Sequence, residues 1–261
     1  MDRPQSVACI QAQLSQPEVV GEAAICEAIE RQQTVLNLSN RNLSFLPASI
    51  EKLCYVKRLL LNNNSLLMPP VELLALVNLQ ELTLDHNRLT LLPSGIGRLE
   101  KLTYLNLSHN HLGSLPRDIG ELASLTELWI VNVELSVLLP EIGQIKTLKK
   151  LSVKNNMLSS LPAEIGQLAQ LKWLCLANNQ LRDLPSEFGQ LSELFYLDLS
   201  HNGFDTIPEC LTELPKLMSL MLRGNHIPSL CDNMLLGLSD LVKLDLRENP
   251  FTERPVHWKV C

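Results

Sequence analysis

The chain has 261 residues, of which 46% are hydrophobic, so it is long enough to bury an extended core. Its net charge is −6, from 22 basic and 28 acidic side chains, and no basic stripe dominates, which argues against nucleic acid as a partner. No apolar run approaches the ~18 residues of a membrane span, and the first ten residues contain no signal-peptide core. Seven scattered cysteines, without terminal clusters, favour a reducing, cytoplasmic location.

The first 32 residues are predicted to form a tail and a helix. Residues 15–18 read as a capping box with an early proline, which predicts a helix from Pro17 to Gln32. Its apolar stripe consists of Val20, Ala24, Ile25, Ala28 and Ile29. We expect this helix to cover the first unit of the array that follows, because terminal units of a stack need a polar cap. Docking of a partner on the helix is the alternative.

From residue 33 the chain repeats itself. Eight of the nine steps between unit starts are 23 residues long and the last is 24. The starts are Gln33, Val56, Leu79, Leu102, Leu125, Leu148, Leu171, Leu194, Leu217 and Leu241. Such a period is the signature of a solenoid, in which a unit buries its leucines only against its neighbours. We expect ten repeats over residues 33–253 and a closing tail over 254–261, with Trp258 folded over the last open core.

Each unit changes its hydrophobic pattern halfway along. The first half follows L-x-x-L-x-L-x-x-N-x-L, whose alternation predicts a short strand with its leucines turned inward. The second half follows L-P-x-x-I-G-x-L and predicts a short helical turn, with proline fixing φ at its start and glycine easing its exit. The fold class is therefore an α/β solenoid, a curved horseshoe with a parallel sheet on the concave face and short helical or 3-10 turns on the convex face.

These motifs carry a family resemblance. The second-half pattern occurs as LPSGIGRL, LPRDIGEL and LPAEIGQL in residues 92–99, 115–122 and 161–168, and as LPSEFGQL in residues 184–191. With them the chain resembles the intracellular Ras-group leucine-rich-repeat proteins and the repeat domains of the Scribble and Erbin scaffolds over residues 33 to about 251. The resemblance implies an adaptor or scaffold in signal transduction, with small Ras-like GTPases, phosphatase subunits and cell-polarity proteins as partner classes.

One asparagine per unit follows the strand. The column consists of Asn64, Asn87, Asn110, Asn156, Asn179, Asn202, Asn225 and Asn249. The resemblance implies that these amides form a ladder bridging backbone groups of adjacent units, since a buried amide must be hydrogen-bonded. The column is interrupted at Arg41 and at Val133, whose unit also has its proline one place late, at Pro140. The Val133 unit is either a tolerated irregularity or a local kink that re-aims Trp129.

The variable places of each unit, the second, third, fifth, seventh and eighth, are expected to line the concave face. Four of the six Trp and Tyr residues fall in them, which favours binding over cross-strand packing alone. Lysines at positions 149, 150, 154 and 172 fall between the two tryptophans, which predicts a basic centre with aromatic shoulders for an acidic peptide or loop; a solvated face is the alternative. The predicted protein-binding residues are Tyr104, Glu127, Trp129, Lys150, Lys154, Trp173, Tyr196 and Asp198. Met218 and Met221 extend this surface.

Other chemistry has little support in the sequence. The chain contains no phosphate-cradling glycine loop, no G-x-S-x-G, no H-E-x-x-H and no C-x-x-C, so we expect no enzyme activity and no cofactor. His86 and His109 share a column beside Asp85, which favours stacked imidazoles over a metal site.

We expect a monomer that binds a protein. Two other functions stay open: a structural or assembly protein using its convex face or its ends, and the recognition arm of a larger enzyme.

Overall fold

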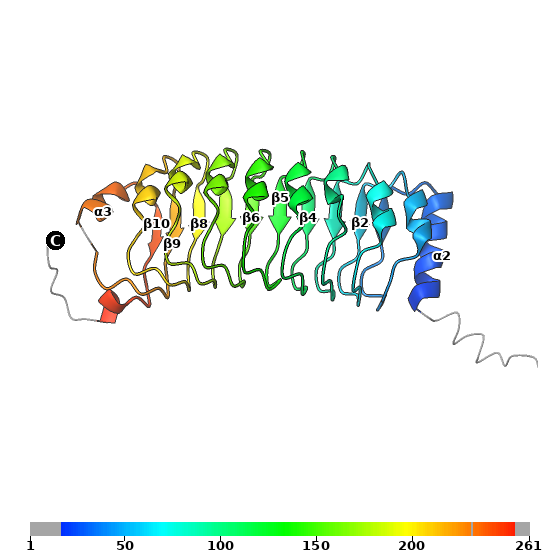
Figure 1. Cartoon of the computed structure of the whole chain (residues 1–261), viewed down its shortest axis with the longest axis horizontal. Helices are drawn as coiled ribbons and strands as arrows, with labels where there is room; N and C mark the ends of the chain where they lie inside the picture. The colour runs from blue at the N-terminus through cyan, green and yellow to red at the C-terminus, as the bar shows by residue number, and fades with distance from the viewer. Residues whose placement is uncertain (1–16, 231, 254–261) are drawn as a thin grey trace, which may run out of the picture.

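The computed structural model describes residues 17–230 and 232–253, which form a single ten-stranded parallel sheet in chain order (Figure 1). The predicted capping box at Ser15, the tail 254–261 and Trp258 lie outside the described residues. The strands are β1 (Val35–Asn37), β2 (Arg58–Leu60), β3 (Glu81–Thr83), β4 (Tyr104–Asn106), β5 (Glu127–Trp129), β6 (Lys150–Ser152), β7 (Trp173–Cys175), β8 (Tyr196–Asp198), β9 (Ser219–Met221) and β10 (Lys243–Asp245). This arrangement confirms the predicted solenoid.

Each strand turns one leucine inward and two side chains outward. In β5 to β8 the central leucine is fully buried, as Leu128, Leu151, Leu174 and Leu197 show. The strands pair in register at the spacing of the repeat, so each leucine packs on its counterparts in the neighbouring units. Burial of a leucine side chain stabilises the fold by ~1.5–3 kcal/mol. The outward residues of the strands are thereby placed in straight columns.

Short 3-10 helices return the chain along the opposite side. They are η1 (Ala48–Lys52), η2 (Val71–Ala75), η3 (Ile96–Arg98), η4 (Arg117–Glu121), η5 (Pro140–Gln144), η6 (Ala163–Gln167), η7 (Ser186–Gln190), η8 (Glu209–Glu213) and η9 (Pro250–Glu253). Proline precedes most of them in extended conformation, for example Pro162 with φ −69°. The glycines serve close packing between turns rather than the exit of the chain, because a Cβ at Gly143 or Gly166 would overlap a backbone carbonyl of the next turn.

The asparagine column lies buried beneath the ends of the strands. The Asn156 amide nitrogen donates to the carbonyls of Ile130 and Val153 at 2.8 and 2.9 Å. Its oxygen accepts from the backbone amides of Val133 and Leu135 at 3.1 and 3.0 Å. A single side chain therefore ties two consecutive units together through four backbone groups.

The Val133 unit keeps the strand register of its neighbours and differs from them in its backbone after Val133. β5 pairs in register with β6, so Trp129 lies opposite Ser152 as the repeat requires. Leu139 takes the place before η5 that proline takes before η6, with nearly the same φ and ψ, −70° and 147° against −69° and 148° for Pro162. The kink considered for Trp129 is therefore absent. The backbone changes only after Val133, where Glu134 has a φ of +64°; among the described units the same place has a positive φ only at Asn42, which follows Arg41.

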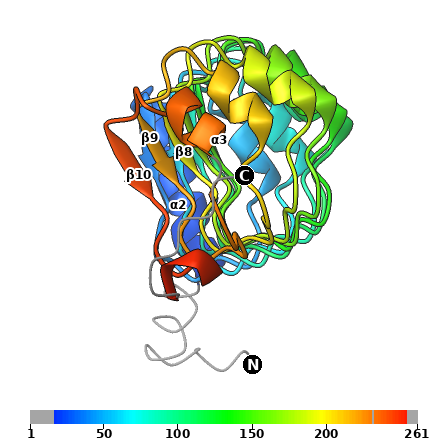
Figure 2. The same cartoon turned by 90° about the vertical axis from the view of Figure 1, so that its left-hand side faces the viewer.

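The two ends of the stack differ. At the first unit α2 (Pro17–Glu30) buries Ile25 and Ala28 against the core, and Ser49 donates a 2.8 Å hydrogen bond to Glu22 (Figure 1). In the ninth unit the short α3 (Asp232–Gly237) replaces a 3-10 turn, and in the tenth unit Leu244 is only partly buried. Along the long axis, the middle units bulge toward the helical side, so the sheet lines the concave side of a shallow arc (Figure 2). Among the described residues, none of the helices has the length and apolarity to cross a bilayer.

Candidate functional site

Three aromatic side chains form a continuous stack on the concave face. The ring centroids of Trp129 and Trp173 lie 5.4 Å apart, and those of Trp173 and Tyr196 lie 5.3 Å apart with an interplanar angle of 6°. All three side chains are part-buried, on strands whose leucines point inward. We call this stack of Trp129, Trp173 and Tyr196 the aromatic ladder. Ring pairs in this range stabilise one another by ~0.5–1.5 kcal/mol beyond burial.

The two tryptophans meet although a strand separates them. On β6, the strand between them, Ser152 lies opposite Trp129 and Lys150 lies opposite Trp173, and Ser152 is only 2% exposed. The predicted arrangement, in which lysines separate the two tryptophans, is therefore wrong: the lysines border the aromatic ladder.

The lysines around the ladder divide into two kinds. Lys150 forms an ion pair with Glu127, with Nζ 2.9 Å from the carboxylate. Lys149, Lys154 and Lys172 form no ion pair with any residue in the described ranges, and Lys149 and Lys172 are exposed. The ladder is thus bordered by lysines that form no ion pair in those ranges, although the charge of Lys172 acts on the nearby Glu193 carboxylate.

Polar groups near the ladder are poorly solvated. Burial raises the pKa of the Cys175 thiol to about 11, and the neighbouring Asp198 adds to the shift. Burial raises the pKa of Tyr196 as well, again with help from Asp198. The indole Nε1 of Trp129 is buried and has no hydrogen-bond partner within the described part of the chain, which costs about 1–3 kcal/mol. Cys175 is therefore a poor nucleophile, and the surroundings are suited to packing rather than to chemistry.

Tyr104 lies apart from the ladder. It stands on β4 opposite Glu127, and burial followed by the charge of Asp85 raises its pKa. Nearby, His86 and His109 stack with centroids 4.2 Å apart and an interplanar angle of 13°, as the shared column suggested. Burial raises the pKa of Asp85 and lowers that of His109. This second group is polar and has no large apolar surface.

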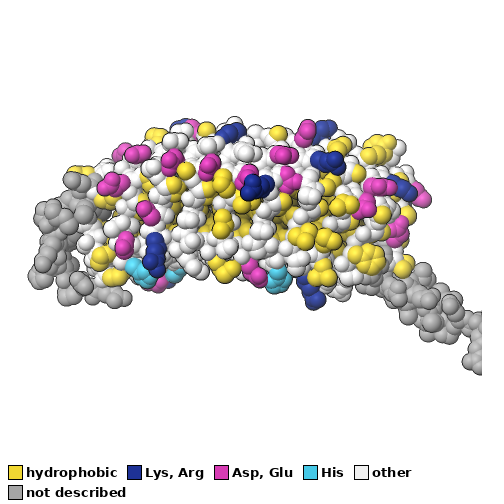
Figure 3. All heavy atoms as spheres, viewed as in Figure 1, with side chains coloured by type: hydrophobic (Ala, Val, Ile, Leu, Met, Phe, Trp, Pro, Cys, Tyr) yellow, Lys and Arg dark blue, Asp and Glu magenta, His cyan; other side chains and the backbone are white. Residues whose placement is uncertain are grey.

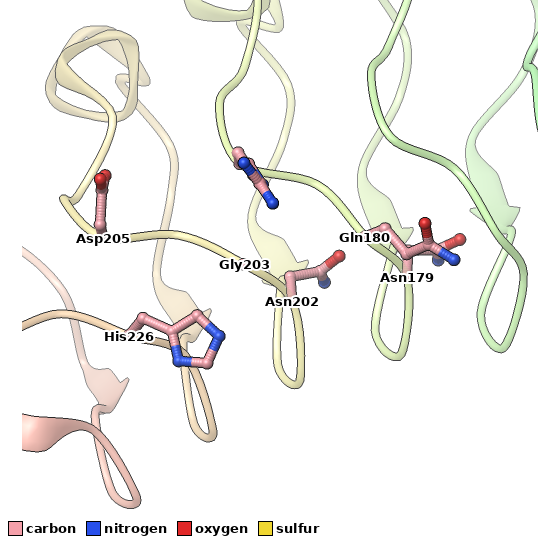
Figure 4. Close-up of a pocket in the computed structure, with 7 residues that line it drawn as sticks. Asn179, Gln180, Asn202, Gly203, Asp205 and His226 are labelled. Atoms are coloured by element: carbon pink, nitrogen blue, oxygen red, sulfur yellow. The ribbon is translucent and has the colours of Figure 1, made fainter.

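A polar notch lies on the loops that follow β7 to β9. The tenth place of each unit normally carries a side chain, but in the eighth unit it is Gly203, and a cavity of about 460 Å³ opens there (Figure 4). Figure 4 shows His226 beside the gap and the Asp205 carboxylate turned away from it. The amides of Asn179 and Asn202 in its lining already bond to backbone carbonyls. Gln180, Arg182, Asp205 and His226 line the rest of it, so the notch is mainly polar.

Exposed hydrophobic side chains extend the concave surface beyond the predicted residues. Phe195 and Val242 are 43% and 77% exposed, and they flank Met218 in the second-place column. The sequence contained this signal, because the column turns from lysine to apolar residues after Lys172. The side opposite the sheet carries its charged side chains mainly along the edge of the 3-10 helices, with a band of hydrophobic ones below (Figure 3).

The comparisons agree with this architecture. The leucine-rich repeat region family matches residues 33–163 and 159–253. A solved structure of a leucine-rich-repeat protein from Leptospira interrogans is 39% identical, with a TM-score of 0.81, over 88% of this chain and 59% of that one. The search of curated proteins gave no match. A repeat array with variable columns on a concave sheet defines a class of protein-interaction modules. The chain belongs to the leucine-rich repeat family.

Proposed function

We propose that the chain is a cytoplasmic adaptor or scaffold module that binds a partner protein on its concave face at the aromatic ladder. The observation that carries the proposal is the coincidence of stacked, part-exposed Trp173 and Tyr196 with the unpaired Lys149 and Lys172. Tryptophan and tyrosine dominate the binding energy of protein interfaces because they bury large areas at low entropic cost. The resemblance to Ras-group and Scribble-type repeat proteins supports a signalling role, with a small Ras-like GTPase or a polarity protein as the partner class.

The test removes the two indoles together. In Trp129→Ala/Trp173→Ala we expect partner affinity to fall ~100-fold or more, since hot-spot truncations cost ~2–4 kcal/mol each. The melting temperature should stay within a few degrees, because neither side chain belongs to the leucine interior. Affinity purification with this variant and with Tyr55→Ala, which removes a half-exposed aromatic off the sheet, gives the comparison. Partner recovery by the double variant at the level of the unaltered protein would remove the concave face as the site.

A second candidate function is assembly through the C-terminal end. In the described residues β10 pairs only with β9, so one strand edge is free, and Leu241, Leu244 and Leu246 are only partly buried. Exposed strand edges favour pairing with another chain. Under this alternative, the mass in solution should rise with concentration, and Leu244→Lys should abolish the rise. A constant monomeric mass would exclude it.

A further inference from the structure

Three exposed apolar side chains continue the aromatic ladder toward the C-terminal end. Phe195, Met218 and Val242 are 43%, 51% and 77% exposed. The Met218 amide donates to the carbonyl of Phe195 at 3.0 Å, and the Val242 amide donates to that of Met218 at 2.9 Å, so the three residues lie side by side, each directly before a strand. Phe195 directly precedes Tyr196 in the chain, which joins these residues to the ladder. We call the ladder with Phe195, Met218 and Val242 the apolar stripe.

The apolar stripe crosses the sheet diagonally. It begins at the fifth place of its unit at Trp129, moves to the third place at Trp173 and Tyr196, and reaches the second place at Met218. From β5 to β10 it spans five strand spacings, which is ~24 Å. A helix of ~16 residues has this length. The length of the stripe therefore matches one elongated element that lies across the strands. The tip of a single loop would cover only a small part of it.

The backbone of the sheet decides which kind of element fits. β6 to β9 are each paired on both sides, so the stripe offers side chains and no free backbone donors or acceptors. An extended segment pressed on this surface would bury its own amides and carbonyls unpaired, at a cost of ~1–3 kcal/mol for each. A helix satisfies its backbone internally and presents apolar side chains at every third or fourth residue.

Charge along the stripe is asymmetric. Where the stripe crosses β6 and β7, three lysines without ion pairs in the described part of the chain border it. Lys149 and Lys172 directly precede the two strands, and Lys154 follows β6. Near β9 and β10 two arginines are paired, Arg223 with Glu248 and Arg247 with Asp245, and Lys243 is the one exposed lysine without an ion pair to the described residues. A partner element should therefore carry acidic residues at the end that covers β6 and β7.

We infer that the apolar stripe binds an amphipathic helix of the partner protein, about four turns long, with acidic residues flanking its apolar face at one end. This inference rests on the proposed function and specifies the partner segment. It predicts that binding extends along the stripe to Met218 and Val242, well beyond the two tryptophans.

The test uses a displayed library of random 18-residue peptides, selected on the whole chain and assayed as synthetic peptides by fluorescence anisotropy. We expect enriched sequences with apolar residues at helical spacing and with Asp or Glu toward one end. Met218→Ser/Val242→Thr should weaken these peptides ~10-fold, since each change removes an exposed apolar contact from the interface. Lys149→Glu/Lys172→Glu should weaken them at least ~10-fold and reduce the salt dependence of binding.

Matched controls separate the inference from the proposed function. Val137→Ser removes a side chain of comparable exposure outside the stripe, and Lys57→Glu changes the same column in the second unit, so both should bind normally. Peptides lost in Trp129→Ala/Trp173→Ala but unchanged in the Met218 and Lys149 variants would overturn the helix and leave the proposed function standing. Peptides indifferent to all these changes, or no enrichment at all, would overturn both. Enriched peptides without acidic residues or helical spacing would overturn the inference alone.

Discussion

The concave face has two halves with the same backbone and different side-chain chemistry. Over β1 to β4 the outward side chains largely satisfy each other: Arg58 pairs with Glu81 at 2.5 Å, and the imidazoles of His86 and His109 stack. Over β5 to β10 the outward surface keeps apolar area and the unpaired charge of Lys149. Affinity for a partner depends on groups whose burial lowers the free energy, so the second half is the better binding surface.

The boundary between the halves coincides with the irregular unit. Val133 takes the place of an asparagine, so the ladder of amides has one rung fewer between the fourth and sixth units. Asn110 and Asn156 still bond on either side of it. Stability of a solenoid is a sum of unit and interface contributions, so cooperativity is weakest where an interface loses contacts. The change in surface chemistry and the weakest amide link therefore fall at the same place.

The largest effect is expected from removing the next rung, in Asn156→Ala. Four buried backbone groups would lose their partner, at a total cost of about 3 kcal/mol or more. The melting temperature should fall by roughly 6–12 °C. With two consecutive units lacking the amide, the halves should unfold separately, so circular dichroism and tryptophan fluorescence should give different midpoints.

The control is the neighbouring Asn155→Ala. Asn155 is exposed, has φ of +56° and accepts one hydrogen bond from Asn178, so its loss should cost about 1 kcal/mol through left-handed strain. Unfolding of this variant should stay a single transition. Coincident midpoints in Asn156→Ala, with a loss no greater than in the control, would show that the boundary is not a mechanical weak point.

Much of this architecture could be predicted from the sequence. The period set the strand register, and the alternation set which residues face out, so Trp129, Trp173 and Tyr196 were placed on the concave face correctly. Ring contact was not predictable from spacing alone, because it depends on how far indoles reach across a small residue such as Ser152. For the same reason, the sequence did not show that the lysines border the two tryptophans and do not separate them.

Other features depend on contacts and backbone conformations that the repeated sequence positions do not show. Gly166 is needed because successive turns approach closely there. The sequence of a single turn does not show this distance. The proline shift at Pro140 left both a tolerated irregularity and a kink open in the sequence, and Leu139 adopts the same extended backbone without a proline. A backbone conformation common to many residues can be kept by a neighbour that is not proline.

A smaller effect is expected from Asp85 in the first half. Burial raises its pKa, so the folded state holds this proton more tightly than the unfolded chain, whose value is near 3.8. The stability from the neutral carboxyl is full below that value and is lost as pH rises through the folded pKa. Asp85→Asn should therefore raise the melting temperature at pH 8, by about 1–2 °C.

Acidification should shrink this gain. The charges of His86 and His109 favour ionised Asp85, so a positive charge on these imidazoles makes the carboxylate less costly. Melting curves between pH 5 and 8 test the trend, with Asp205→Asn on an exposed loop as the control that should not change. A gain independent of pH would mean that the substitution acts by packing rather than by charge.

The smallest effect is expected from neutralising the ion pair beside the aromatic ladder, in Lys150→Met/Glu127→Gln. The two side chains are 48% and 28% exposed, and such a pair contributes ~0.2–1 kcal/mol. Because each charge is already satisfied by the other, removing both should leave the melting temperature within about 2 °C and affinity for the selected peptides within ~3-fold. Lys149→Glu/Lys172→Glu, measured in the same titration, should lose far more. Equal losses of affinity in the two double variants would show that all the lysines contribute alike to the electrostatic potential of this surface. The ion pair of Lys150 would then not decide which lysines contribute to binding.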